Sequence, residues 1–321
     1  MESTSFASAS TRAVIVALSL SLVAGCAAST SANRPELRQQ AWSIATGGSD
    51  QLEAIQALDY YPHSITIHAG DTVTWTNPTT IPHMIAIPQA GQSPPPGPPN
   101  QAPVGGNVFD NSAYISSGFL MNGKTYSVKF TAPGSYAYYC MVHPPEMTGA
   151  IIVLPATSPL PENAAQYAAG ALADLTDDLQ AGIASLQLFP FAPGGTHLAA
   201  GIAPGLPGAK PSQSTVLRFL DDTTTNGDIT IAVGTTLTWT NESNDVPHTV
   251  TFPIEGQQPP AGPPDMPPSG GPTYDGTVLT NSGVMSPAAN YSLTFTKAGT
   301  YKYYCLFHDG PTGMIGTVTV Q

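Results

Sequence analysis

Polar and apolar residues alternate along several short segments of this chain. The alternation has a period of two in residues 64–68 and 72–76, and again in residues 126–130 and 291–295. These segments are rich in β-branched and aromatic residues, a pattern typical of strands that bury one face. Glycines between the segments, such as Gly70, favour turns. Several short strands separated by turns predict an all-β fold built of β-sandwich domains.

The pattern occurs twice along the chain. His83 and His248 lie 165 positions apart (248 − 83), and Cys140 and Cys305 keep the same spacing (305 − 140). Upstream of these histidines the equivalent residues are 164 positions apart, so the second copy has one inserted residue. Because 321 residues suffice for two domains, the repeat predicts two tandem domains of the same fold.

The residues between the two copies have a helical pattern instead. Apolar residues recur there at spacings of three or four positions: Ala168, Leu172, Leu175, Leu179, Ile183 and Leu186. Pro161 suits the first position of a helix. We therefore expect an amphipathic connecting helix within residues 161–189 that packs on one of the domains. Residues 190–211 have the composition of a loop.

The N-terminus has the features of a secretion signal. Residues 13–23 are apolar but too few to span a bilayer, and they follow a short polar segment with one positive charge. Residues 23–26, Val-Ala-Gly-Cys, resemble the lipobox of bacterial lipoproteins. That resemblance implies cleavage before Cys26, a lipid on its sulfur, and an extracytoplasmic protein anchored to a bacterial membrane. None of the three cysteines lies in a pattern that suggests a disulfide.

These patterns divide the chain into five segments. The predicted segments are a lipoprotein signal peptide (1–25), a flexible tether (26–40), a first β-sandwich domain (41–156), a helical linker (157–195) and a second β-sandwich domain (196–321).

Composition narrows the possible partners. Only 9% of the residues are charged while Gly (31) and Pro (33) are abundant, which favours short strands and long loops. The formal net charge is −12. This charge argues against nucleic acid and anionic lipid as electrostatic partners, and it favours either a basic partner or solubility alone. Proline-rich residues 91–99 and 256–264 occupy equal positions in the two copies, so we expect them to form ordered loops.

A short loop after a predicted strand contains three candidate metal ligands. Residues 135–139 are strand-like, and Cys140, His143 and Met147 follow them with the spacing Cys-x2-His-x3-Met. A thiolate, an imidazole and a weakly bound thioether together are typical of a mononuclear copper site that transfers electrons. Such a site needs a second histidine, and His83 follows the Trp-containing strand of this copy.

The second copy offers the same ligand types. Cys305, His308 and Met314 follow a similar strand, here with the spacing Cys-x2-His-x5-Met, and His248 lies upstream. In both copies the methionine comes two residues before a glycine that opens the last predicted strand. This shared position predicts that Met147 and Met314 are equivalent axial ligands.

These motifs resemble those of the cupredoxins, the plastocyanin/azurin family of blue copper proteins. The resemblance is carried by Gly-x-Tyr-x-Tyr-Tyr-Cys-x2-His, by Met-x-Gly before a closing strand, and by an upstream Pro-His. It implies a Greek-key β-sandwich in each domain, with copper bound by one Cys and two His in a plane and by a distant Met. Carried over by position, the implied metal ligands are His83, Cys140, His143 and Met147 in one domain and His248, Cys305, His308 and Met314 in the other.

The family also implies a function without catalysis. Its members pass single electrons between redox proteins, here an unidentified donor and acceptor such as a cytochrome or an oxidase. Electrons would enter through the exposed edge of the loop histidine, His143 or His308. A copper-buffering or copper-delivery protein would use the same ligands, so that alternative stays open.

A copper enzyme is a further alternative. Two-domain nitrite reductases and laccases bind additional copper through histidines next to the blue-site cysteine, where this chain has Tyr139 and Tyr304. The histidines left over, His63, His68 and His197, form no His-x-His motif. A zinc site is disfavoured by the methionine in each loop.

Overall fold

The computed structural model describes the chain in nine segments. They are residues 39–95, 102–143, 147–188, 195–203, 213–221, 227–243, 246–260, 267–310 and 313–321. The predicted signal peptide, Cys26 and most of the predicted tether lie outside the described residues, so lipidation of Cys26 stays a prediction. In the described segments, no helix has the length and apolar character needed to cross a bilayer.

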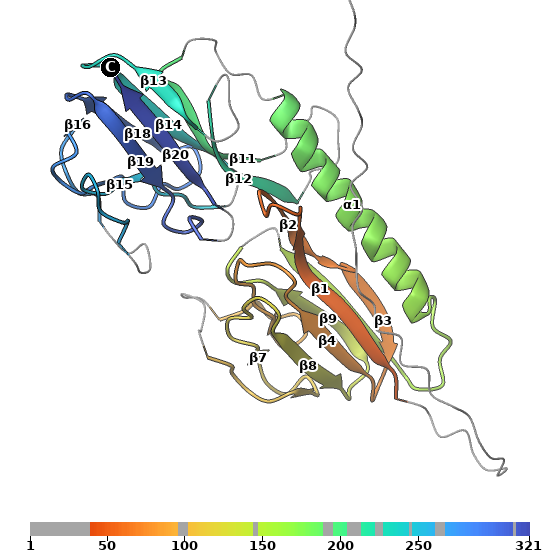
Figure 1. The fold of residues 1–321 in the computed structure, drawn as a ribbon. Helices are drawn as coiled ribbons and strands as arrows, with labels where there is room; N and C mark the ends of the chain where they lie inside the picture. The colour runs from red at the N-terminus through yellow and green to blue at the C-terminus, as the bar shows by residue number, and fades with distance from the viewer. Residues whose placement is uncertain are drawn as a thin grey trace, which may run out of the picture. The chain divides into compact units, whose positions relative to one another are not determined.

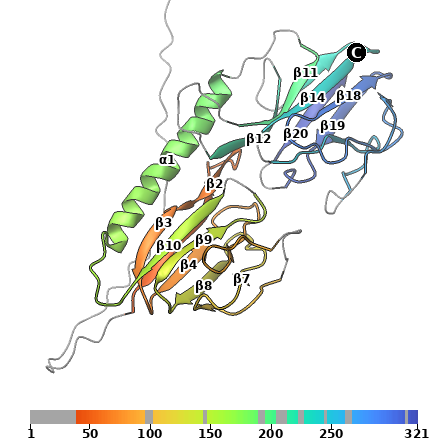
Figure 2. The ribbon, with the colours of Figure 1, turned by 180° about the vertical axis from the view of Figure 1, so that it is seen from behind.

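The first copy forms two five-stranded layers (Figure 1). Its strands are β1 (Ala41–Ser49), β2 (Ile55–Tyr61), β3 (Ser64–His68), β4 (Thr72–Thr76), β5 (Ala86–Ile87), β6 (Val108–Phe109), β7 (Ile115–Ser116), β8 (Thr125–Phe130), β9 (Gly134–Tyr139) and β10 (Thr148–Leu154). One layer has the order β2-β1-β4-β8-β6 and the other β3-β10-β9-β5-β7. Figure 2 shows β3, β10 and β9 side by side in the second layer.

The second copy repeats this arrangement. Its strands are β11 (His197–Ile202), β12 (Ser214–Leu220), β13 (Ile229–Ile231), β14 (Thr236–Glu242), β15 (Thr251–Phe252), β16 (Thr273–Tyr274), β17 (Thr280–Asn281), β18 (Asn290–Phe295), β19 (Gly299–Tyr304) and β20 (Ile315–Val320). Its layers have the orders β12-β11-β14-β18-β16 and β13-β20-β19-β15-β17, strand for strand those of the first copy. The prediction of an all-β fold with two β-sandwiches is confirmed.

Each sandwich has the same aromatic core. Trp75 packs edge-on against Tyr138 with ring centroids 5.3 Å apart, and Trp239 packs on Tyr303 at the same distance. All four rings are fully buried. The tryptophan comes from the strand that alternates in sequence, and the tyrosine from the strand that leads to the cysteine. The core therefore fixes the strand from which each candidate ligand loop departs.

Ten strands were not predicted: the two-residue strands β5, β6, β7, β15, β16 and β17, and the four longer strands β1, β2, β11 and β12. β1, β2, β11 and β12 lack the simple alternation, and β11 falls within residues 190–211, which we expected to be a loop; that expectation was wrong. Both β2 and β12 are buried at six of their seven positions. A strand covered on both faces has no polar face, so its sequence does not alternate.

The two unpredicted strands β2 and β12 pair with each other, antiparallel, and join one layer of each sandwich into a ten-stranded sheet. A small buried cluster of Leu58, Leu217, Ile81 and Val246 lies at this junction. Ile81 and Val246 each precede an upstream histidine by two residues. The junction therefore lies next to the segments that carry these histidines.

The connecting helix α1 (Ala164–Leu188) is present, but it begins later than predicted. Asn163 caps it: Oδ1 accepts hydrogen bonds from the amides of Ala165 (3.0 Å) and Gln166 (3.1 Å). The Gln166 side chain in turn accepts a bond of 2.9 Å from the Asn163 amide, which completes a capping box. The expectation that Pro161 is the first helical residue was wrong, because the side chain that satisfies the free amides is that of Asn163.

The buried face of α1 differs in part from the predicted one. Ala168 and Leu172 are exposed, whereas Tyr167 packs edge-on against Trp42 at 5.9 Å. Farther along, the helix packs against β2 (Figure 1). The close contact requires glycine at position 182, because a Cβ there would lie 2.4 Å from Ile55 Cγ2. The helix contacts strands of both sandwiches and shares one buried cluster with them.

Candidate metal centres

Site 1 comprises His83, Cys140, His143 and Met147, which converge from three parts of the first sandwich. Cys140 follows β9 directly and Met147 precedes β10, so the loop between these paired strands brings both residues to one end of the sandwich. His83 forms an isolated β-bridge with Leu120, with backbone hydrogen bonds of 3.2 and 2.7 Å. Paired backbone thus fixes the position of each predicted ligand.

The donor atoms of site 1 lie close together. Cys140 Sγ is 3.9 Å from His83 Nδ1 and 3.6 Å from His143 Nδ1. All three donor atoms lie within 4.8 Å of one another. The three side chains are buried, and His143 keeps 7% of its surface exposed. The structure therefore brings together three residues that are up to 60 positions apart in sequence (143 − 83).

Site 2, comprising His248, Cys305, His308 and Met314, has the same construction. Cys305 Sγ is 3.6 Å from His248 Nδ1 and 3.3 Å from His308 Nδ1. His248 forms an isolated β-bridge with Met285, as His83 does with Leu120. His308 keeps 8% of its surface exposed.

The donor sets fit a metal ion with sulfur and nitrogen ligands. Metal bonds of about 2.3 Å to a thiolate and about 2.0 Å to an imidazole, in trigonal or tetrahedral geometry, place sulfur and nitrogen about 3.5–3.8 Å apart. The four distances of 3.3–3.9 Å lie around this range. One thiolate with two imidazoles and a nearby thioether is the donor set of an electron-transfer copper site.

The two methionines have equivalent backbone positions despite the different loop lengths. The Met147 carbonyl accepts a hydrogen bond of 2.9 Å from the Cys140 amide, and the Met314 carbonyl accepts one of 3.1 Å from the Cys305 amide. Each methionine amide in turn donates to the carbonyl of the loop histidine. Both side chains are buried in the same core cluster as their cysteine. The two additional residues of the second loop therefore leave the methionine beside the site.

Burial keeps both sites electrically neutral in the absence of a metal ion. It lowers the pKa of His143 to about 4 and that of His308 to about 3, the latter with a smaller contribution from His143. Burial also raises the pKa of each thiol, Cys140 and Cys305, to about 11. At neutral pH the imidazoles are therefore ready to bind, whereas metal binding must displace a proton from the thiol.

A buried asparagine supports the upstream histidine in each copy. Asn77 Nδ2 donates to the carbonyls of Ile81 (2.8 Å) and Leu120 (2.7 Å), so it ties the histidine segment to the segment that bridges it. Asn241 makes the equivalent two bonds in the second copy, both of 2.9 Å. No role was predicted for these two asparagines, although their matched positions in the repeat were the available signal.

The copies differ behind the histidine ring. Thr79 Oγ1 lies 3.3 Å from His83 Nε2, and it also donates to Asn77 Oδ1. Its counterpart Ser243 bonds to the corresponding asparagine. In the described part of the chain, the buried His248 Nε2 has no hydrogen-bond partner.

The copies also differ beside the sulfur. Tyr60 packs against Tyr138 with the rings tilted by 59° and their centroids 4.6 Å apart, and its hydroxyl donates to the Met84 carbonyl (2.6 Å). Burial raises the pKa of Tyr60, and the nearby Cys140 raises it further. Phe219 takes the same position against Tyr303, at 4.5 Å, and has no hydroxyl.

The remaining histidines make other contacts. His63 Nδ1 lies 3.0 Å from Asp59 Oδ1, His68 Nε2 lies 2.7 Å from the Ser158 carbonyl, and His197 Nε2 lies 2.6 Å from Thr240 Oγ1. Within the described segments, the groups of His, Cys, Asp or Glu that are able to share one metal ion are those of sites 1 and 2.

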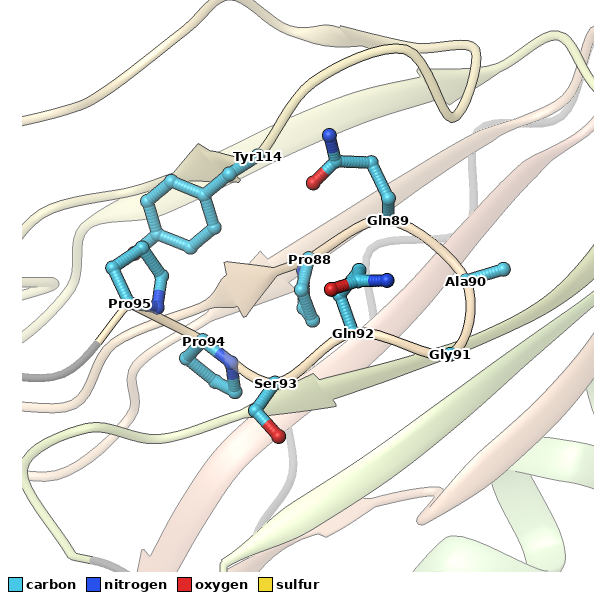
Figure 3. Close-up of a pocket in the computed structure, with 9 residues that line it drawn as sticks. All are labelled: Pro88, Gln89, Ala90, Gly91, Gln92, Ser93, Pro94, Pro95 and Tyr114. Atoms are coloured by element: carbon cyan, nitrogen blue, oxygen red, sulfur yellow. The ribbon is translucent and has the colours of Figure 1, made fainter.

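The described part of the first proline-rich segment lines an open hollow. Figure 3 shows residues 88–95 curving around it, with Pro95 next to the ring of Tyr114. None of the lining side chains is a His, Cys, Asp or Glu. Residues 96–101 and 261–266, where the rest of both segments falls, lie outside the described residues, so the predicted order of these loops stays a prediction.

Comparisons with known proteins agree with the donor sets. The sequence profile of "Copper binding proteins, plastocyanin/azurin family" matches residues 50–154 and 221–321. Plastocyanin from Scenedesmus fuscus is 34% identical over 89 residues, which are 27% of this chain and 76% of that protein. Amicyanin-alpha from Methylorubrum extorquens is 33% identical over 109 residues, 34% of this chain and 75% of that protein.

A solved structure is also similar to part of the chain. The crystal structure of amicyanin from Paracoccus versutus has 22% sequence identity and a TM-score of 0.25, and the match covers 37% of this chain and 86% of that one. The family match spans most of both sandwiches, and each sandwich contains one His-Cys-His-Met donor set. This chain is a tandem, two-domain member of the copper-binding plastocyanin/azurin family.

Proposed function

We propose that the chain carries single electrons between redox proteins outside the cytoplasm, with one type 1 copper in each domain. The observation that supports this most strongly is the doubled, buried assembly of a thiol and two imidazoles at distances of 3.3–3.9 Å. A buried, preassembled site exchanges electrons with little rearrangement, because its ligands are already held in place by the β-bridges and the paired strands.

Each residue has a distinct part in this proposal. Cys140 and Cys305 would bind copper as thiolates, the four imidazoles would bind it through Nδ1, and Met147 and Met314 would be weak axial ligands. Bound copper supplies the one-electron Cu(I)/Cu(II) couple, which soft sulfur and borderline nitrogen ligands suit in both states. The core around the sites excludes water, and the loop histidines His143 and His308 are the routes by which electrons enter and leave.

Partners and location are inferred from charge and from the N-terminus. The net charge of −12 favours a donor or acceptor with a basic surface, such as a cytochrome or an oxidase. The lipobox-like segment before Cys26 supports attachment to a bacterial membrane through a lipid. The plastocyanin-like and amicyanin-like sequences support a carrier and not an enzyme.

The decisive experiment measures copper in the chain lacking residues 1–26. We expect two coppers per chain, an intense thiolate-to-copper absorption band, and the paramagnetic resonance of type 1 Cu(II). Cys140→Ser and Cys305→Ser should each remove one copper and one component of the absorption band. The double variant should bind no copper and lack the band. Full colour in both single variants would exclude these ligands.

The alternative of copper buffering or delivery predicts a different behaviour. A carrier keeps its copper through repeated oxidation and reduction and exchanges electrons rapidly with itself. A delivery protein would instead lose copper readily to a copper-free acceptor protein. Measuring copper retention in the presence of a chelator, alongside the self-exchange rate, separates the two functions.

A further inference from the structure

A glycine lies directly behind the upstream histidine in each copy. Gly47 in β1 has φ +78° and Gly201 in β11 has φ +71°, backbone conformations that favour glycine. A Cβ on Gly47 would lie 2.7 Å from His83 Nε2, and one on Gly201 would lie 2.3 Å from His248 Nε2. At both distances the histidine ring or the strand has to move before a side chain can fit.

Both glycines lie at β-bulges. The register of β1 on β2 shifts between Thr46 and Gly48, and the register of β11 on β12 shifts between Ala200 and Ile202. A glycine with positive φ at a bulge is a recurrent feature that redirects the strand locally. Here the bulge places the backbone of Gly47 against the imidazole ring of His83, and that of Gly201 against the imidazole ring of His248.

The two glycines are equivalent, although they do not share the spacing of the other repeated residues. Ile44 pairs with Trp75 and Leu198 with Trp239, which aligns β1 with β11 at an offset of 154 positions (198 − 44). Gly47 and Gly201 have the same offset. Both lie outside the segments that match the family profile.

We propose that Gly47 and Gly201 are positioning residues of the two copper sites, which hold the upstream histidine by contact with the ring edge opposite the metal-binding nitrogen. This inference rests on the proposed function. Nδ1 of each ring faces the cysteine sulfur, while Nε2 faces the glycine. A methyl group at the glycine would push on Nε2 and tilt the ring, and the tilt would displace Nδ1 from the metal.

The contact matters more in the second copy. His83 Nε2 also has the hydroxyl of Thr79 at 3.3 Å, whereas the buried His248 Nε2 has no hydrogen-bond partner in the described segments. The space behind His248 is also narrower, because a Cβ on Gly201 would lie 2.3 Å from His248 Nε2 whereas one on Gly47 would lie 2.7 Å from His83 Nε2. We therefore expect Gly201→Ala to perturb its site more than Gly47→Ala.

The test examines one site at a time. Gly47→Ala is made in the Cys305→Ser chain, which retains only site 1, and Gly201→Ala in the Cys140→Ser chain. We expect a changed copper hyperfine coupling, a shifted thiolate-to-copper band, and a 10–100-fold loss of copper affinity, the range found when groups that orient a ligand are removed. Unchanged spectra and affinity in both variants would overturn the proposal.

The chain offers a matched control for backbone strain. Gly70 and Gly234 are an equivalent pair with φ +101° and +87°, and a Cβ on either would meet nothing within 4 Å. Gly70→Ala and Gly234→Ala impose similar strain without touching a histidine, so their spectra should match the parent chains. Equal spectral changes in the control and test variants would refute the contact as the cause.

A measurement without copper separates this inference from the proposed function. In the copper-free chain, the ring nitrogen resonances of His83 should shift in Gly47→Ala and stay unchanged in Gly70→Ala. Circular dichroism verifies that each variant is folded. A parent chain that binds no copper would refute the proposed function, whereas unshifted ring resonances in a folded Gly47→Ala variant would refute the positioning role.

Discussion

Gln56 of β2 lies opposite Thr215 of β12 at the centre of the ladder that joins the two sandwiches. Two backbone hydrogen bonds of equal length, 2.7 Å, flank this pair: Leu58 N to Gln213 O, and Leu217 N to Ala54 O. Each of these residues is related to its counterpart by the same offset of 159 positions (215 − 56, 217 − 58). The junction is therefore a local pseudo-two-fold axis within one chain, as in an isologous dimer interface.

This symmetry predicts equal contributions from the two junction leucines. Leu58 and Leu217 are buried side chains of the same cluster. Leu217→Ala and Leu58→Ala should each lower the free energy of unfolding by about 2–5 kcal/mol, the range for a buried leucine that leaves a cavity. Denaturant-induced unfolding measures both values.

Leu172 supplies the control for these junction variants. Its side chain is 43% exposed on the outer face of α1, so Leu172→Ala should change the free energy of unfolding by less than about 0.5 kcal/mol. A junction variant that behaves like Leu172→Ala would show that the two sandwiches do not depend on this contact.

The copper-free protein should lose stability in mild acid. Burial lowers the folded-state pKa of His143 to about 4, against about 6.5 in the unfolded chain. The unfolded state therefore binds the proton more readily, and stability falls as the pH falls from about 6.5 to about 4. The difference is worth about 3 kcal/mol for this residue alone, at 1.36 kcal/mol per pKa unit.

Unfolding by denaturant at several pH values checks this dependence. His143→Gln removes one titrating group, so its free energy of unfolding should vary less between pH 6.5 and pH 4 than that of the parent chain. Equal slopes for the two proteins would show that His143 remains accessible to protons in the folded state.

The candidate ligands were predictable because chemistry and spacing coincide in them. Cys140, His143 and Met147 lie within one loop, where a thiol, an imidazole and a thioether at short spacing are rare by chance. His83 is isolated in sequence, and only its constant distance from Cys140 in both copies connected it to the loop. The strands that carry these residues bury one face, so their alternation was visible as well.

The residues that surround the ligands were less predictable, for physical reasons. One face of β2 and of β12 packs with α1, and the other face packs in the sandwich cores and the junction cluster, so neither strand alternates. Gly47 and Gly201 escaped the repeat comparison because the connections after β1 and β11 differ in length, which changes the offset to 154. The role of each glycine depends on the short distance between its backbone and the histidine ring opposite it. The sequence alone does not give this distance.

The axial methionines provide a test of each site separately. Met147→Leu conserves volume and should leave the sandwich folded, at a cost below about 1.5 kcal/mol. Leucine cannot donate to Cu(II), and it makes the site more apolar, so the reduction potential of site 1 should rise. Electrochemical titration with and without Met147→Leu in the Cys305→Ser chain measures this potential. Each tenfold change in the equilibrium ratio of Cu(I) to Cu(II) corresponds to about 59 mV.

Met314→Leu tests the equivalent residue of the longer loop. Met147 and Met314 make the same backbone hydrogen bonds to the cysteine and the loop histidine of their site. If these bonds place both thioethers alike, Met314→Leu in the Cys140→Ser chain should raise the reduction potential of site 2 by a similar amount. Met121, which is 48% exposed, supplies the control: Met121→Leu should leave both potentials unchanged. A potential that is insensitive to Met314→Leu would mean that this thioether does not reach the copper.

Tyr60 is expected to make the two sites unequal. Its single hydroxyl proton is donated to the Met84 carbonyl at 2.6 Å, and the nearby Cys140 sulfur competes for that proton, whereas Phe219 offers no such group to Cys305. A hydroxyl proton shared with a thiolate stabilises negative charge on sulfur, weakens the donation of sulfur to Cu(II), and so favours Cu(I). Tyr60→Phe should therefore lower the reduction potential of site 1 and leave that of site 2 unchanged.

Electrochemistry of the two single-site chains measures this difference directly. Tyr136→Phe is a suitable control, because this buried tyrosine belongs to the same core cluster but its hydroxyl bonds to the Ala132 carbonyl at 3.0 Å. Both substitutions remove one hydroxyl from the core, so a general loss of packing would affect both proteins alike. A potential that rises in Tyr60→Phe, or that falls equally in Tyr136→Phe, would show that the hydroxyl does not act on the sulfur.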